Sequence, residues 1–254
     1  MLAKVKKIFS ADIIKVSSLN AVSTLIKMLT SFISMKVVAL LPNGPVAVAL
    51  LGQLNNFTII LQNISNGGIN NGITKYLAEY ADSEKRYVLF LRTGFWITAI
   101  LSVICGVVLI SGAGYFSVLI LKNPEYTGIF YILGATITLY ALNALLISII
   151  NGFREFRKYV IANISGSLVG LLFTIVLSFS FGVYGALISA VTYQSVVFVI
   201  TLFIVSKSKW FNWEIITGKI SKLAAGKLGH YSLMALVSAL AIPIGQLIVR
   251  NYIS

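Results

Sequence analysis

The side chains of this sequence that could do chemistry are polar residues placed inside long apolar stretches. Lys27 lies near the middle of the stretch 13–41, where an ionisable group is costly and usually faces water or a partner group. On a helix that turns by about 100° per residue, further polar side chains fall within about 60° of Lys27. They are Asn20, Ser23, Thr24, Thr30, Ser31 and Ser34. We therefore expect one face of this stretch to be polar from end to end.

A second polar face is predicted for the apolar stretch 46–66 and the residues that follow it. Its members are Gly52, Asn56, Asn63, Asn66, Gly67 and Asn70, with Gln53, Asn55 and Gln62 beside them. Two neighbouring helices with facing polar stripes indicate a water-accessible lumen. The alternative is that these groups only bond the helices to each other, which explains a lysine in mid-helix and so many amides poorly.

Arg250 is a second candidate cation inside an apolar stretch, because it lies near the end of 230–253 and after Pro243. It either faces the same lumen or reaches the lipid headgroups. The predicted lumen thus offers cationic, amide and hydroxyl groups and no carboxylate, a set that suits an anionic, hydroxyl-rich solute. The candidate substrate-binding residues are Lys27, Asn20, Ser23, Thr30, Ser34, Asn56, Asn63, Asn66, Asn70 and Arg250.

Residues that could support catalysis or bind a metal are scarce. His230 is the single histidine and Cys105 the single cysteine, so the sequence predicts neither a zinc site nor an intrachain disulfide. Asp82 and Glu84 could chelate a metal with a phosphorylated substrate, but no third carboxylate is spaced to join them. Surface charge balance is the simpler explanation of the carboxylates. Without a P-loop or a dinucleotide-binding glycine motif, we expect no cofactor, no metal and no enzyme activity.

The elements that must position these residues are hydrophobic helices. The chain is 58% apolar and 11% charged, which excludes a soluble fold, because soluble domains carry roughly 25% charged residues. About 20 apolar residues cross a bilayer as a helix, since a helix satisfies its own backbone hydrogen bonds. The predicted spans are 13–41, 46–66, 93–112, 128–150, 160–180, 183–205 and 230–253. We expect an all-α integral membrane protein, a polytopic bundle of about seven transmembrane helices.

The positive charges alternate from one inter-span segment to the next. Sixteen of the twenty Lys and Arg residues lie at the amino terminus or between spans two and three, four and five, and six and seven. Lys122 alone lies in the other segments. The positive-inside rule then places the amino terminus in the cytoplasm and the turn 41–45 outside. The net charge of +13 therefore needs no nucleic acid to explain it.

Aromatic residues follow the sixth span. Beside Lys207 and Lys209 lie the aromatic residues Trp210, Phe211 and Trp213. We interpret them as an interfacial aromatic belt that meets anionic lipid headgroups. A partner-binding helix at 213–228 is the alternative.

The run 68–80, GINNGITKYLAEY, resembles the corresponding segment of Wzx-type O-antigen and other lipid-linked oligosaccharide flippases. These are members of the multidrug/oligosaccharidyl-lipid/polysaccharide (MOP) exporter superfamily. The resemblance extends over the whole chain and includes the basic first helix with Lys27, the Asn151-Gly152 pair before Arg154, and an amphipathic link at 206–229.

The resemblance implies a V-shaped transporter of two MATE-like lobes with six helices each. Such proteins move undecaprenyl-pyrophosphate-linked O-antigen repeat units from the cytoplasmic to the periplasmic leaflet of the bacterial inner membrane by alternating access. In this chain Lys27 would meet the pyrophosphate or an acidic sugar. The implied partners are the lipid-linked oligosaccharide, membrane lipids and other polysaccharide assembly proteins.

The same resemblance divides the chain into a six-helix lobe at 1–205, a cytoplasmic linker at 206–229 and the first helix of a second lobe at 230–254. Because the sequence ends there, we expect a fragment of a longer transporter.

Three other functions stay open at the level of the sequence. The first is a drug or lipid exporter of the same superfamily; a drug pump coupled to cations would be expected to carry acidic residues in its cavity. A membrane enzyme of polysaccharide assembly would need clustered carboxylates or histidines. A truncated scaffold would persist in the membrane without moving any substrate.

Overall fold

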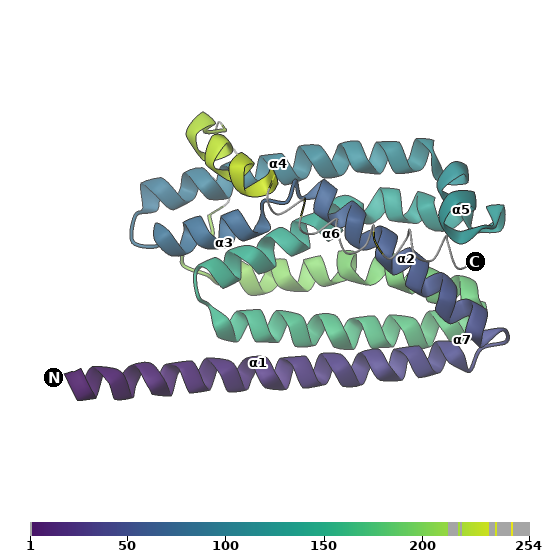
Figure 1. Cartoon of the computed structure of the whole chain (residues 1–254), viewed down its shortest axis with the longest axis horizontal. Helices are drawn as coiled ribbons and strands as arrows, with labels where there is room; N and C mark the ends of the chain where they lie inside the picture. Colours follow the sequence, from purple (N-terminus) through teal and green to yellow (C-terminus); the bar gives the residue numbers. More distant parts are fainter. Residues whose placement is uncertain (1, 213–217, 219, 234–236, 238–244, 246–254) are drawn as a thin grey trace.

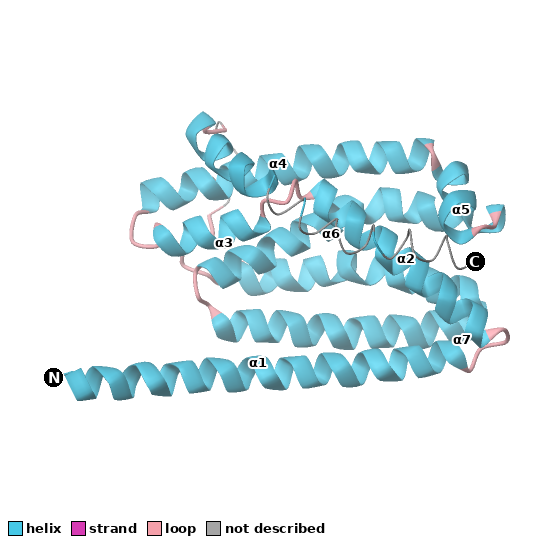
Figure 2. Ribbon diagram, viewed as in Figure 1, coloured by secondary structure: helices cyan, strands magenta, loops and turns pink. Residues whose placement is uncertain are grey.

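The fold was analysed in a computed structural model, in which residues 2–212, 218, 220–233, 237 and 245 are described. The helices are α1 (Leu2–Ala39), α2 (Gly44–Ser65), α3 (Asn70–Glu79), α4 (Glu84–Ser111), α5 (Ala113–Leu121), α6 (Thr127–Gly152) and α7 (Phe156–Val205). A short 3₁₀ turn, Pro124–Tyr126, precedes α6, and residues 222–233, here called the linker helix, are also helical. Figure 2 shows no strand in the described part of the chain. The predicted all-α fold is confirmed.

Five segments are long and apolar enough to cross a membrane: Ser18–Ala39, Gly44–Ser65, Glu84–Ser111, Pro124–Gly152 and Phe156–Val205. The 50-residue α7 is broken at Gly182, whose φ of 59° and ψ of −136° are not helical. The hydroxyls of Thr174 and Ser189 lie 3.3 Å apart, so the two parts of α7 form an antiparallel hairpin. The described residues therefore hold six crossings, in agreement with the six spans predicted between 13 and 205. The predicted span 230–253 lies mostly outside the described residues.

The turns between the helices are set by residues that accept a left-handed backbone or begin a helix. Asn43, with a φ of 62°, precedes α2, and Pro45 lies in the first turn of α2, positions that these residue types favour. After α2, Gly67 and Gly68 have φ values of 59° and 64°, which glycine adopts without strain. The chain turns there into the short, unpredicted α3, so α2 ends before the last members of its predicted polar face.

The helix α6 lies at the centre of the bundle, and α1 lies at its edge. Ile129, Phe130 and Leu133 of α6 are fully buried in a core shared with α2, α4, α5 and α7. By contrast, α1 packs mainly against α7 and α2, and Figure 1 shows it along one side of the bundle. Its apolar residues Leu25 and Phe32 are exposed, as expected of a face that meets lipid.

Most of the basic residues gather at one end of the bundle. The amino terminus and the loops that follow α3, α6 and α7 all lie at this end (Figure 1). These are the segments in which the sequence concentrates Lys and Arg. The predicted alternation of charge along the sequence thus becomes a separation of charge along the molecule.

An aromatic cluster joins the loops at this basic end. The ring of Phe153, after α6, stacks on Trp210, after α7, with centroids 4.9 Å apart, and lies 5.1 Å from the ring of Tyr87 in α4. Trp210 is only 9% exposed. We correct the interpretation of Trp210 as part of an interfacial belt, because Phe153 covers its ring and makes it a core residue. Trp213 lies outside the described residues.

Candidate substrate cavity

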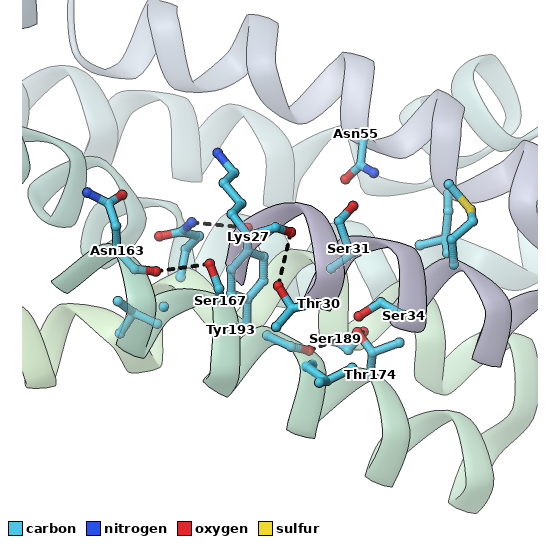
Figure 3. A pocket seen from close by; sticks show the side chains of 18 of the residues that line it. Lys27, Thr30, Ser31, Ser34, Asn55, Asn163, Ser167, Thr174, Ser189 and Tyr193 are labelled. Atoms are coloured by element: carbon cyan, nitrogen blue, oxygen red, sulfur yellow. Dashed lines mark hydrogen bonds between the residues drawn. The ribbon is translucent and has the colours of Figure 1, made fainter. Parts of the chain in front are cut away.

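A cavity lies between α1, α2, α6 and the two halves of α7. Its volume is about 450 Å³, within the range of pockets that hold small ligands. Figure 3 shows Lys27 extending into it from α1, and Ser31 and Asn55 pointing toward one another from α1 and α2. On the opposite side, Asn163 and Tyr193 of α7 face the same space.

The wall formed by α6 and α7 satisfies most of its own hydrogen bonds. Asn143 donates from Nδ2 to Oε1 of Gln194 at 2.8 Å, and Gln194 Nε2 donates to the hydroxyl of Tyr193 at 3.0 Å. The hydroxyl of Ser167 donates to the carbonyl of Asn163 at 3.0 Å. Asn143 Oδ1 is buried without a partner and remains as an acceptor. Side chains held in this way form a rigid wall.

The wall formed by α1 and α2 is different, because most of its polar side chains have no partner in the described part of the chain. They are Lys27, Ser31 and Ser34 from α1, and Asn55 and Gln62 from α2. An ammonium group donates, while hydroxyl and amide groups both donate and accept. A ligand in the cavity therefore finds most of its available hydrogen-bonding groups on α1 and α2.

Lys27 gives the cavity its positive charge. Among the described lining residues there is no other Lys or Arg and no Asp or Glu. Lys27 also forms no ion pair with a described carboxylate. An unpaired cation at the edge of a low-dielectric region attracts an anion more strongly than it would in water. The arrangement fits a ligand that combines a negative charge with many hydroxyl groups.

The predicted residues of the first span divide between the cavity and the packing around it. Lys27, Thr30 and Ser34 line the cavity, although the Thr30 hydroxyl donates back to carbonyls of its own helix. Asn20 and Ser23 do not line it, because the cavity faces the later turns of this span. Ser23 is buried without being part of the lining.

Of the candidate substrate-binding residues that follow the first span, none that the structure describes lines the cavity, although Gly52 of the predicted polar face does. Asn56 and Asn63 lie elsewhere on α2, and Asn63 Nδ2 donates to a carbonyl of its own helix at 2.9 Å. Asn55 and Gln62, the residues immediately before Asn56 and Asn63, do line the cavity. One residue step along a helix changes the direction of the side chain by about 100°. Asn66 lies in the turn after α2 and Asn70 begins α3, and Arg250 lies outside the described residues.

Sequence reasoning missed the side of the cavity formed by α6 and α7. Asn163, Ser167 and Thr174 line it, and their spacing places them on one face of a helix. That spacing, interpreted as a polar stripe, could have found them. Asn143 and Gln194 give no comparable signal, because their pairing depends on how α6 and α7 pack.

Comparison with known sequences identifies the family of the chain. The family described as "Polysaccharide biosynthesis protein" matches residues 13–254. The chain belongs to this family. Among its curated relatives, the lipid III flippases of Escherichia coli (strain K12) and Shigella flexneri are each 25% identical over 241 residues, or 94% of this chain. The chain spans 58% of the length of each of these two relatives.

Solved structures of MOP superfamily transporters share the fold of this family member. A transporter from Pyrococcus furiosus, whose binding pocket has a reverse polarity that suggests a different function, matches with a TM-score of 0.75 and 16% identity. The match covers 94% of this chain and 54% of that one. An outward-facing multidrug resistance MATE family transporter matches with a TM-score of 0.71 and 18% identity, over 94% of this chain and 55% of that one. The predicted MATE-like membrane fold is confirmed.

Proposed function

We propose that this chain forms a substrate-binding lobe of a flippase that carries a lipid-linked oligosaccharide across the membrane. The observation that carries the proposal is the chemistry of the cavity. It holds one cation and no carboxylate among its described lining residues, together with hydroxyl and amide groups that have no partner in the described part of the chain. The family and its flippase relatives support the same function.

Charge selects the solutes that enter such a cavity. A phosphate oxygen about 4 Å from the Lys27 ammonium gains roughly 4 kcal/mol at an effective dielectric near 20, before desolvation is subtracted. Sugar hydroxyls can replace water at Ser31, Ser34 and Asn55 with little loss, because these side chains both donate and accept. A lipid-linked glycan brings both chemistries in one molecule.

The finer form of the proposal names the substrate and the direction of transport. The substrate is an undecaprenyl-pyrophosphate-linked O-antigen repeat unit, moved from the cytoplasmic to the periplasmic leaflet of the bacterial inner membrane by alternating access. The concentration of Lys and Arg at one end of the bundle supports a cytoplasmic location for that end. Because the chain spans 58% of the length of its flippase relatives, we assign the activity to a full-length transporter in which this lobe works. Other polysaccharide assembly proteins would receive the glycan.

The test is the surface display of a glycan polymer in cells whose own flippase gene has been deleted. A full-length transporter that contains this lobe should restore display, while the empty vector should leave the lipid-linked glycan in the cytoplasmic leaflet. Lack of display at normal membrane levels of the protein would contradict the proposal. Efflux of a cationic dye in place of glycan display would favour a drug exporter.

A further inference from the structure

A second group of cations lies at the basic end, where the linker helix meets α3. The ammonium of Lys75 in α3 donates to the hydroxyl of Tyr231 in the linker helix at 2.8 Å. In the opposite direction, Lys227 of the linker helix donates to the hydroxyl of Tyr80, just after α3, at 3.1 Å. The two segments are about 150 residues apart in the sequence, with separations of 156 and 147 for these bonds. Each segment thus offers one ammonium to a tyrosine of the other.

Shared aromatic rings bring the cations close together. The ammonium groups of Lys75 and Lys227 lie 5.3 and 5.6 Å from the centroid of the same ring, that of Tyr76. The guanidinium of Arg86, in the first turn of α4, lies 5.4 Å from the ring of Tyr80, and Lys227 lies 5.5 Å from that ring. Three cations therefore surround two stacked tyrosines.

Apolar packing holds the linker helix in this position. Ala224 and Leu228 are fully buried in a core shared with α3 and α4. Gly72 of α3 permits the close approach, because a Cβ at this position would lie 3.1 Å from Leu228 Cδ2 and 3.2 Å from Tyr231 Cβ. Docking of the linker helix thus has an apolar basis of its own, and the cations are placed beside it.

The two ammonium groups keep capacity for a further ligand. Lys75 is exposed and Lys227 partly exposed, and each uses one of its three donors in the hydrogen bond to tyrosine. Within the described residues neither forms an ion pair with a carboxylate. The hydrogen bond to tyrosine raises the pKa of each lysine above its ordinary value, and Glu79 adds to the effect from beyond ion-pair distance. Both lysines are therefore cations at neutral pH.

We propose that Lys75 and Lys227, with Arg86 beside them, form a second anion site, which binds a phosphate or diphosphate group and clamps the linker helix to α3. Phosphate presents several charged oxygens in different directions, so it can accept from ammonium groups on two separate segments at once. The tyrosine hydroxyls hold the two ammonium groups in place for this ligand. None of the three cations lines the cavity that contains Lys27.

The location indicates where the phosphate group comes from. The helix α3 follows the membrane-spanning α2 after a four-residue turn, and Arg86 opens the membrane-spanning α4. The site therefore lies where a span meets the aqueous phase, within reach of a phosphate carried by a lipid. A phospholipid headgroup and the diphosphate of a prenyl lipid share the chemistry that this site recognises.

The test follows hydrogen exchange of the backbone amides in 222–233, measured by mass spectrometry on the whole purified chain in neutral detergent. One arm titrates farnesyl diphosphate, and the other uses nanodiscs in which phosphatidylglycerol replaces phosphatidylcholine. Ligand should slow the exchange of these amides. The double variant K75Q/K227Q should shift the midpoint of the titration at least about tenfold, since a lost charge-assisted hydrogen bond has an effect of that size.

The control is K209Q/K222Q, which removes the same charge from exposed lysines at the same end of the bundle and should leave the midpoint within about twofold. K75R/K227R keeps the charge and should retain slow exchange in the presence of ligand. A response to farnesyl diphosphate alone assigns the site to prenyl diphosphates, and a response to both ligands assigns it to lipid phosphates in general. The proposal is overturned if K75Q/K227Q and K209Q/K222Q behave alike in both arms. It is equally overturned if K75R/K227R, eluting as a single species, loses the response.

Discussion

At the scale of single residues, the two walls of the cavity have different tasks. Asn143, Gln194 and Tyr193 bond to one another and form a fixed surface. Lys27 and Ser31 on α1 have no partner in the described part of the chain and are free to bind a solute. In the proposed function, Lys27, the one cation among the described lining residues, would give the cavity a preference for anions.

Water access to the α1 wall can be tested by cysteine labelling. In a background with Cys105→Ala, Ser31→Cys and Ser34→Cys should react with a hydrophilic thiol reagent in intact membranes, because both positions line the cavity. Phe32→Cys is the matched control, since Phe32 is 69% exposed on the apolar outside of α1 and should meet lipid. Equal labelling of all three positions would exclude a water-filled cavity.

The sequence predicts the cavity residues of α1 better than those of any other helix. The reason is physical: a lysine inside an apolar span must face water or a partner, so Lys27 identifies the polar side of its helix. No charged residue identifies that side in α2, where amides occur on several faces, and the prediction chose Asn56 and Asn63 while the cavity contains their neighbours Asn55 and Gln62. The residues of α6 and α7 could be found only from the way these helices pack.

At the scale of elements, the apolar stretches predict the six crossings. The reason is that a bilayer offers no water to the backbone, and an apolar segment that forms a helix satisfies its own backbone hydrogen bonds. The boundary predicted between 180 and 183 coincides with the break at Gly182. The short helices α3 and α5 were not predicted, because each is too short for a span and lies in a segment that separates two spans. Gly67 and Gly68 mark the turn before α3, but they do not reveal which element follows.

Gly182 of the α7 hairpin should be sensitive to substitution because of its backbone conformation. Its φ of +59° with a ψ of −136° belongs to a region that other residues rarely adopt, and no atom lies within 4 Å of an added Cβ. Gly182→Ala should therefore lower the stability in detergent by about 1–3 kcal/mol through backbone strain alone. Gly114→Ala is the control, because that site is equally open, has no positive φ and lies in a helix that alanine favours. Thermal unfolding followed by circular dichroism measures both, and equal midpoints would contradict the assigned backbone geometry.

At the scale of the whole molecule, the separation of charge between the two ends predicts the orientation in the membrane. Reporter fusions after Asn43 and Asn123 should give periplasmic activity, and fusions after Asp82 and Lys158 should give cytoplasmic activity. Asn43, Asp82 and Asn123 lie in turns between crossings, and Lys158 lies in the first turn of α7, so each site reports one end of the bundle. Opposite activities at two or more sites would reverse the proposed direction of transport.

The central claim is that the charge of Lys27 holds the phosphate or acidic sugar of the substrate during transport. The most direct measurement is surface display of the glycan polymer in flippase-deficient cells that express the full-length transporter with each substitution of Lys27, with membrane levels determined in parallel. Lys27→Arg should retain most of the display, because it keeps the cation. Lys27→Ala and Lys27→Glu should reduce it at least about tenfold, since a loss of about 1.4 kcal/mol is already a factor of ten. Full display by Lys27→Ala at normal membrane levels would contradict the account, because a cation that only contributes to structure can be replaced by an apolar residue without loss of transport.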